Sequence, residues 1–227
     1  MSIETNYINL GDNMRYDFIF FENAIKALET EKRFNHTLGV QKEAYELGNI
    51  FLPNKAYKLQ LSGLLHDITK DFSLEKQLKL CEKYNVSIDK NNIVPKLLHA
   101  KTGCEYAREL FGKEVIDDEI YSAIYYHTTG RNNMSLFEAI IYLADYIESG
   151  RTFEDCVLLR SYFYDNIKNA NSFDDKLEIL RKTMVLSFDL TIKNLIEENK
   201  QIDMDTIEAR NYFLTNKSVF KNDLQEE

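Results

Sequence analysis

The residues best suited to chemistry in this sequence are its histidines. The 227-residue chain contains four of them, His36, His66, His99 and His127, spaced about thirty residues apart. A single histidine near a helix end is usually an ordinary core or surface residue, so none of the four indicates a site by itself. Their meaning depends on the carboxylates that accompany them.

Two aspartates interrupt strongly apolar stretches. Asp67 follows His66 directly at the end of the run LSGLLHD, and Asp145 lies within the run IIYLADYI. A carboxylate or an imidazole carried into a protein interior must be hydrogen-bonded or bound to a metal, because an unpaired polar group there is costly. Mixed imidazole and carboxylate ligands suit iron, manganese, cobalt, nickel or zinc better than magnesium or calcium. The sequence therefore predicts a transition-metal centre.

Cationic side chains near these residues indicate an anionic substrate. Arg33 lies one helical turn before His36, and its planar guanidinium is suited to phosphate. Lys70 lies three residues after Asp67, so a continuing helix would place both on one face. There Lys70 could meet phosphate or steady the carboxylate, whereas a solvated surface lysine is the alternative interpretation.

Further candidates lie in the second half of the chain. Arg151 follows an apolar helix, and Thr128 opens a loop whose hydroxyls and backbone N–H groups could meet phosphate or could simply form a capping turn. Lys101 and Arg131 are interpreted as plain surface charges. The chain has neither a Gly-rich phosphate loop nor a nucleophilic Ser or Cys motif. A metal that activates water and neutralises phosphoryl charge therefore fits the pattern better than covalent catalysis.

Helices must position these residues. Glycine (8) and proline (2) are scarce, and apolar residues recur at helical spacing along most of the chain. Ser73 and Ser135 are expected to cap helices, and Pro95 suits the first turn of another. The predicted helices begin at about Met14 and then cover approximately 31–51, 55–66, 74–84, 95–111, 117–127, 136–148, 152–168, 173–198 and 204–215.

The predicted architecture is an all-α, single-domain helical bundle. A loosely held lead-in (1–13) precedes the domain (14–216), and a polar tail (217–227) follows it. The net charge of −9 argues against nucleic acid as a partner, and no apolar run is long enough to cross a membrane. The three cysteines are far apart and are interpreted as reduced thiols, and no signal peptide is apparent. A cytoplasmic protein is expected.

Four segments, in order, resemble one known group of proteins. They are Arg33–Val40 (RFNHTLGV), Gly63–Lys70 (GLLHDITK), Ala123–Gly130 (AIYYHTTG) and Ile141–Glu148 (IYLADYIE). Together they resemble the motifs of the HD superfamily of hydrolases and, more narrowly, of the YqeK family. The similarity covers roughly residues 30 to 215. A bare His-Asp pair would be a weak signal, but four linked motifs in order are a specific one.

The resemblance implies both a fold and an activity. The fold is an HD-type helical bundle, and the activity is that of a symmetrical bis(5′-nucleosyl)-tetraphosphatase, which splits diadenosine tetraphosphate into two ADP. By position, the primary metal ligands would be His36, His66, Asp67 and Asp145, with iron as the leading candidate for the metal. Asp67 and Lys70 are the expected catalytic residues.

The resemblance leaves two roles open for His99 and His127. They would either hold a second metal, bridged by Asp67, or contact substrate phosphate. The four primary ligands already form a usable site with open positions, which favours phosphate contact. A homodimer is a further possible assembly. The expected substrate-binding residues are Arg33, His36, Asp67, Lys70, His99, His127, Thr128 and Arg151.

Other functions also stay open. An HD-type site could act on deoxynucleoside triphosphates, nucleoside monophosphates or cyclic phosphodiesters, although the loop 128–133 and the helix 141–151 resemble the YqeK family more. A non-catalytic nucleotide-binding module is disfavoured because all six metal-type residues are present. Two departures from the family, at Ala100–Gly103 and at Ser149-Gly150, bear on loop shape and remove no ligand. The helices over 173–215 are expected to form the base-binding wall.

Overall fold

Helices account for nearly all of the regular structure. The computed structural model describes residues 7–9, 14–88 and 94–220, and within these ranges it contains two short strands, one 3-10 helix and ten α-helices. The α-helices are α1 (Phe18–Lys26), α2 (Glu31–Phe51), α3 (Ala56–Leu65), α4 (Leu74–Lys83), α5 (Pro95–Phe111), α6 (Asp118–Tyr126), α7 (Leu136–Ile147), α8 (Glu154–Ile167), α9 (Phe173–Glu197) and α10 (Met204–Thr215). The 3-10 helix, η2 (Pro53–Lys55), joins α2 to α3.

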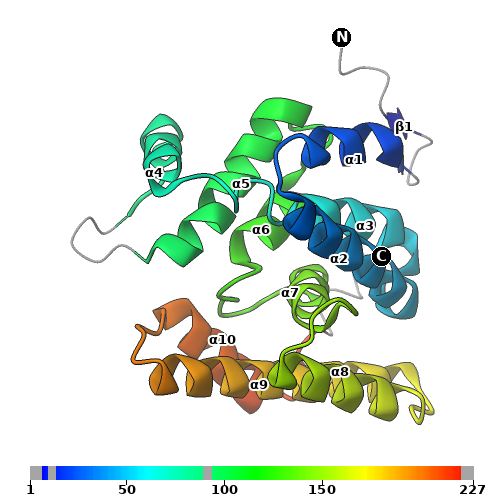
Figure 1. The fold of residues 1–227 in the computed structure, drawn as a ribbon. Coiled ribbons are helices and arrows are strands. Elements are labelled where there is room, and N and C mark those ends of the chain that lie inside the picture. The colour runs from blue at the N-terminus through cyan, green and yellow to red at the C-terminus, as the bar shows by residue number, and fades with distance from the viewer. Residues whose placement is uncertain (1–6, 10–13, 89–93, 221–227) are drawn as a thin grey trace.

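Helix α7 lies at the centre of the bundle. It packs against α2, α3 and α6 on one side and against α8 and α9 on the other (Figure 1). Its apolar residues are buried on every face, from Leu136 and Phe137 to Ile147. A helix that is apolar all round is stable only in a protein core. The position of α7 therefore explains how Asp145 is carried toward the interior.

The predicted helix starts rest on side-chain caps. The Ser135 hydroxyl accepts a hydrogen bond from the Glu138 backbone N–H, and the Glu138 carboxylate accepts one from the Ser135 N–H in return. Ser73 caps α4 through the Lys76 N–H, and Pro95 occupies the first turn of α5. The two serine caps satisfy backbone donors that have no partner inside the helix, whereas Pro95 has no backbone N–H that needs one. Each of these starts is confirmed.

The N-terminal region departs from expectation. The strand β1 (Tyr7–Asn9) pairs antiparallel with β2 (Met14–Tyr16), inside and beside the segment expected to be a loose lead-in. Helix α1 therefore begins at Phe18 rather than near Met14, with Asp17 as its cap. Helical spacing of the apolar residues did not reveal the pairing because a two-stranded hairpin is a contact between segments. Residues 1–6 and 10–13 lie outside the described part of the chain.

The beginning of the expected polar tail is also buried. Val219 and Phe220 are 4% and 3% exposed, and Phe220 contacts the ring of Phe213 on α10. These two apolar residues close the core after α10, so the packed region extends at least to residue 220. Residues 221–227 lie outside the described residues. Among those described, no helix is both long and apolar enough to span a membrane. The all-α architecture is confirmed, with one added hairpin.

Candidate metal and substrate site

Six side chains from five parts of the chain meet beside α7. His36 comes from α2, His99 from α5, His127 from the end of α6 and Asp145 from α7, and His66 with Asp67 directly follows α3. Asp67 and the last three histidines are at most 2% exposed. The structure thus brings together all the residues expected to form the metal centre.

Asp67 lies between two pairs of histidines. Its Oδ2 is 3.4 Å from His66 Nε2 and 3.9 Å from His36 Nε2. Its Oδ1 is 3.0 Å from His99 Nε2 and 3.3 Å from His127 Nε2. The two carboxylate oxygens therefore face different imidazoles, which is the arrangement a bridging carboxylate needs.

Asp145 closes one side of the centre. Its Oδ1 is 3.0 Å from His36 Nε2 and 3.6 Å from His66 Nε2, and it also accepts a hydrogen bond from Arg151. Burial would raise the pKa of Asp145, but Arg151, His36 and His66 outweigh it and hold the pKa well below its ordinary value. The carboxylate is therefore ionised and able to bind a cation.

The outer nitrogens of the imidazoles have their own partners. His66 Nδ1 donates to the Gly63 carbonyl and His127 Nδ1 to the Ile124 carbonyl, each at 2.7 Å. Because a carbonyl can only accept, these bonds place the proton on Nδ1 and direct an Nε2 lone pair at the centre. Imidazoles that bind metals are held in this way.

The residues present fit a metal ion. His36 Nε2, His66 Nε2 and Asp67 Oδ1 are buried and have no hydrogen-bond partner within the protein. Buried polar atoms without partners are costly, and a cation would satisfy all three. The side chains form three overlapping groups whose ligand atoms lie within 4.8 Å of one another: His36, His66 and Asp67; His66, His127 and Asp145; and Asp67, His99 and His127.

Electrostatics differ between the histidines. Burial opposes a charge on His66, but the carboxylates of Asp67 and Asp145 outweigh it and raise the pKa of this ring to about 10. A metal must therefore displace a proton from His66. Burial dominates at His99, where it lowers the pKa to about 3, and burial also lowers the pKa of His127. His99 and His127 are therefore neutral near pH 7, as ligation requires.

Cations surround the centre as expected. Arg33 donates to Asp67 Oδ2 at 2.6 Å, and Arg151 donates to Asp145. Lys70 does not continue α3, which ends at Leu65, but successive turns still place its Nζ 3.0 Å from His99 Nε2 and 4.0 Å from Asp67 Oδ1. Burial lowers the pKa of Lys70.

The two residues interpreted as surface charges have other partners. Arg131 pairs with Glu138, and Lys101 lies over the ring of Tyr125. Neither lines the cavities that adjoin the centre.

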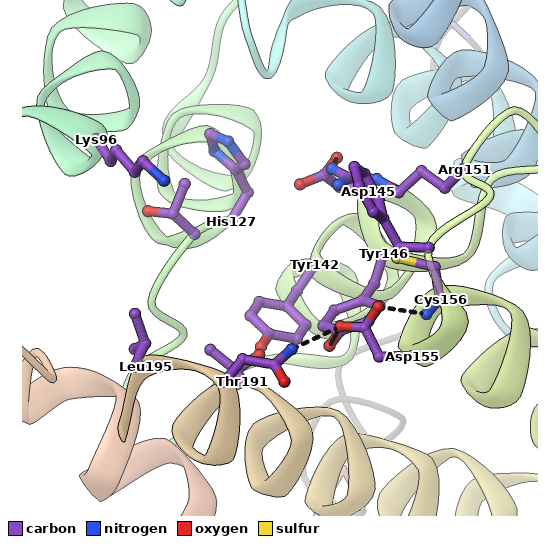
Figure 2. A pocket seen from close by; sticks show the side chains of 13 residues that line it. Lys96, His127, Tyr142, Asp145, Tyr146, Arg151, Asp155, Cys156, Thr191 and Leu195 are labelled. Atoms are coloured by element: carbon purple, nitrogen blue, oxygen red, sulfur yellow. Dashed lines mark hydrogen bonds and ion pairs between the residues drawn. The ribbon is translucent and has the colours of Figure 1, made fainter. Parts of the chain in front are cut away.

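A cavity of about 430 Å³ opens beside the centre, and Figure 2 shows the side chains that line it. His127, Asp145 and Arg151 line it on the side of the metal centre, and Thr191 and Leu195 line it from α9. Of the later helices predicted to form a base-binding wall, α9 lines the cavity, while no residue of α10 does. Thr128, which the sequence analysis predicts to contact substrate, also lines the cavity.

The same cavity contains polar residues that sequence reasoning missed. Asp155 Oδ2 accepts hydrogen bonds from Tyr146 Oη and Asn194 Nδ2, both at 2.9 Å. These residues belong to α8, α7 and α9, so no local pattern in the sequence connects them. They offer a fixed acceptor to the hydroxyl groups of a ligand.

Glu148 is a further residue that the sequence analysis overlooked. Its Oε1 is 3.1 Å from His36 Nδ1, and the side chain is nearly fully buried. His36 holds the pKa of Glu148 below its ordinary value despite burial, which would raise it. Its position three residues after Asp145, on one helix face, was a signal that could have revealed it.

Replacing Glu148 with glutamine should weaken metal binding by about 10- to 100-fold, because His36 loses the charged acceptor that orients its ring. The measurement is metal affinity by competition with a chelator. Glu46→Gln on the same helix as His36 changes an exposed glutamate and serves as the control. Equal affinities in the two variants would contradict an orienting role for Glu148.

Comparisons with known proteins agree with the fold and the centre. A model of the HD domain matches residues 33–150, and the chain therefore belongs to the HD domain family. The "Bis(5'-nucleosyl)-tetraphosphatase, symmetrical" of Staphylococcus aureus is 32% identical over 193 residues, which cover 85% of this chain and 92% of that protein. The protein of the same name from Halalkalibacterium halodurans is 33% identical, over 84% of this chain and 93% of the relative.

A solved structure extends the likeness to three dimensions. An HD superfamily hydrolase from Clostridium acetobutylicum, described as involved in NAD metabolism, matches with a TM-score of 0.75 and 34% identity. The match covers 88% of this chain and 98% of that one. Within the HD family, the chain is a member of the YqeK family of symmetrical bis(5′-nucleosyl)-tetraphosphatases, as its sequence motifs predicted.

Proposed function

We propose that this protein is a metal-dependent hydrolase that splits diadenosine tetraphosphate symmetrically into two ADP. The observation that carries the proposal is the ionised, buried His/Asp centre at the inner end of a ligand-sized cavity. The relatives whose names state this activity align over more than four fifths of the chain.

His36, His66, Asp67 and Asp145 would hold the metal, and we infer iron, since imidazole and carboxylate ligands suit it. Bound there, the metal would activate water and neutralise charge on a phosphoryl oxygen. Arg33 and Arg151 would bind the adjacent phosphates. Each uses one side of its guanidinium to hold a ligand carboxylate, and the buried Nε of each has no hydrogen-bond partner within the protein.

Lys70 would act beside His99 and Asp67, away from the ligand carboxylate that Arg151 holds. Its ammonium lies between His99 and Asp67, where it can stabilise negative charge that develops on a phosphoryl oxygen. Asp67 would order the reaction centre, because both of its oxygens contact ligand imidazoles. The cavity beside Thr128 would take one ADP half, with Asp155 as an acceptor for its ribose hydroxyls.

For His99 and His127, we infer that a second metal is favoured over phosphate contact. Both rings are 2% exposed, lie with their Nε2 atoms 3.1 Å apart and share Asp67 Oδ1. A phosphate would need to displace this packing, whereas an ion would use the existing ligand atoms.

Alanine at His99 should therefore reduce the metal content from about two ions per chain to about one. Metal analysis of the purified, reconstituted protein measures this ratio. A retained ratio combined with slower turnover would favour the phosphate contact that the sequence analysis preferred.

The reaction itself is tested in water labelled with oxygen-18. Symmetrical cleavage should yield ADP alone, with one labelled oxygen per substrate consumed. ATP and AMP would show asymmetric cleavage and contradict the proposal. Rapid turnover of deoxynucleoside triphosphates with the tetraphosphate left intact would instead support the alternative of an HD-type hydrolase of other nucleotides.

Location and assembly stay proposals. We infer a cytoplasmic enzyme, which three free, buried cysteines support, because oxidising compartments favour disulfides. We also infer that nucleic acid is not a partner, given the net charge of −9. Light scattering of the purified protein would test a homodimer.

A further inference from the structure

A second cavity lies on the other side of Arg151. Its volume is about 790 Å³, and it is lined by residues of the first turns of α2, by Asp71 and by the segment between α7 and α8. Two residues, Arg151 and Phe153, line both this cavity and the one beside Thr128. His36 lines the second cavity and Asp145 the first, so the metal centre adjoins both. Each volume is within the usual range of about 300–1,000 Å³ for ligand pockets.

The wall shared by the two cavities is an exposed aromatic ring. Phe153 is 68% exposed, although it directly precedes α8 and its neighbour Cys156 is buried. An exposed aromatic ring in a wall between two cavities is available to a ligand bound in either of them. Aromatic faces of this kind pack well against nucleobases and ribose.

The second cavity also offers unsatisfied hydrogen-bond donors. Arg33 Nε and Arg151 Nε are both buried without a hydrogen-bond partner, and both residues line it. Two of its three acidic residues are already engaged: Asp71 accepts two bonds from Thr30, and Glu148 faces His36 and accepts from Gly150. The third, Glu31, is exposed in the first turn of α2. Asp71 is 3.8 Å from Arg33 Nε, which is too far for a hydrogen bond. An anion bound in this cavity would meet two guanidinium groups whose Nε donors have no partner within the protein.

We infer that the second cavity is a distinct subsite for the second nucleoside diphosphate half of a dinucleoside polyphosphate, with Phe153 dividing the two halves. The inference rests on the proposed function. A dinucleoside tetraphosphate cut at its centre extends equally in two directions from the bridging oxygen of the broken bond, with one nucleoside diphosphate on each side. Two cavities that meet at Arg151, with the metal centre beside both, supply those two directions.

The test compares a two-ended with a one-ended substrate. Diadenosine tetraphosphate needs both cavities, whereas adenosine 5′-tetraphosphate, cut by water into ADP and pyrophosphate, has one nucleoside. Thr152→Trp fills the second cavity and Leu195→Trp the first, and both residues line only one cavity. Leu158→Trp, at an exposed position on α8 that lines neither, is the control.

Thr152→Trp should lower kcat/KM for the two-ended substrate by about tenfold or more and leave the one-ended substrate unchanged. Leu195→Trp should lower both, and Leu158→Trp neither. The single nucleoside of the one-ended substrate could instead bind in the second cavity. Leu195→Trp would then leave the turnover of that substrate unchanged, and this result would equally show two subsites. The inference is overturned if Thr152→Trp changes kcat/KM for neither substrate. It is also overturned if Thr152→Trp and Leu195→Trp each change kcat/KM for the two substrates by the same factor. Failure of the proposed function is distinguishable, because the unmodified enzyme would then not hydrolyse diadenosine tetraphosphate.

Discussion

Asp67→Asn is expected to remove nearly all bound metal, while Lys70→Ala is expected to retain it. Asp67 supplies an oxygen to each histidine pair, and the amide that replaces it has one oxygen and no charge. Lys70 lies beside the centre and has no atom that can bind a cation. Activity should fall in both variants. For Asp67→Asn the fall should be about a thousandfold or more, because the charge stabilisation at phosphorus is lost with the metal.

Metal content per chain, measured after reconstitution, distinguishes the two roles. Circular dichroism should show that both variants keep their helices, since asparagine preserves the shape of the buried side chain. Lys101→Ala, at a lysine outside the site, is the control for Lys70→Ala. Equal metal content in the Asp67 and Lys70 variants would reverse the assignment of ligand and substrate contact.

Gly63→Ala is expected to destabilise the protein and to disturb the metal centre, whereas Gly103→Ala should do neither. A Cβ at Gly63 would lie 2.9 Å from the Val40 carbonyl oxygen and 3.1 Å from the Gln41 Cα, both backbone atoms of α2. Helix α3 must then move away from α2. We expect a loss of about 1–3 kcal/mol in the free energy of unfolding, as for other overpacked core positions.

The two glycines are matched because both lie inside helices. A Cβ at Gly103 would meet Ile68 Cγ2 at 3.4 Å, an ordinary contact, so the higher helix propensity of alanine should offset any cost there. Urea unfolding measures the free energy of unfolding. Metal titration measures the affinity of the centre for its metal, which should fall if His66 and Asp67 are displaced relative to His36. A Gly63→Ala protein as stable as the Gly103→Ala protein would show that α2 and α3 have room to separate.

Much of this protein was determined by its sequence alone. Apart from the start of α1, the helix boundaries follow from apolar periodicity and from capping residues such as Ser135, because both depend on neighbours within a few positions of the chain. The types of the ligands were equally evident: Asp67 and Asp145 interrupt apolar runs, and a buried carboxylate requires a cation or a donor.

The tertiary structure decided how those residues are used. Glu148 meets His36 across 112 residues, and the two oxygens of Asp67 divide the histidines into pairs. The β1–β2 hairpin, the burial of Phe220 and the two cavities that meet at Phe153 are likewise contacts between distant segments. Local periodicity indicates which face of a helix is buried. Which partner covers that face, and which atoms then meet, depends on the packing of the whole chain.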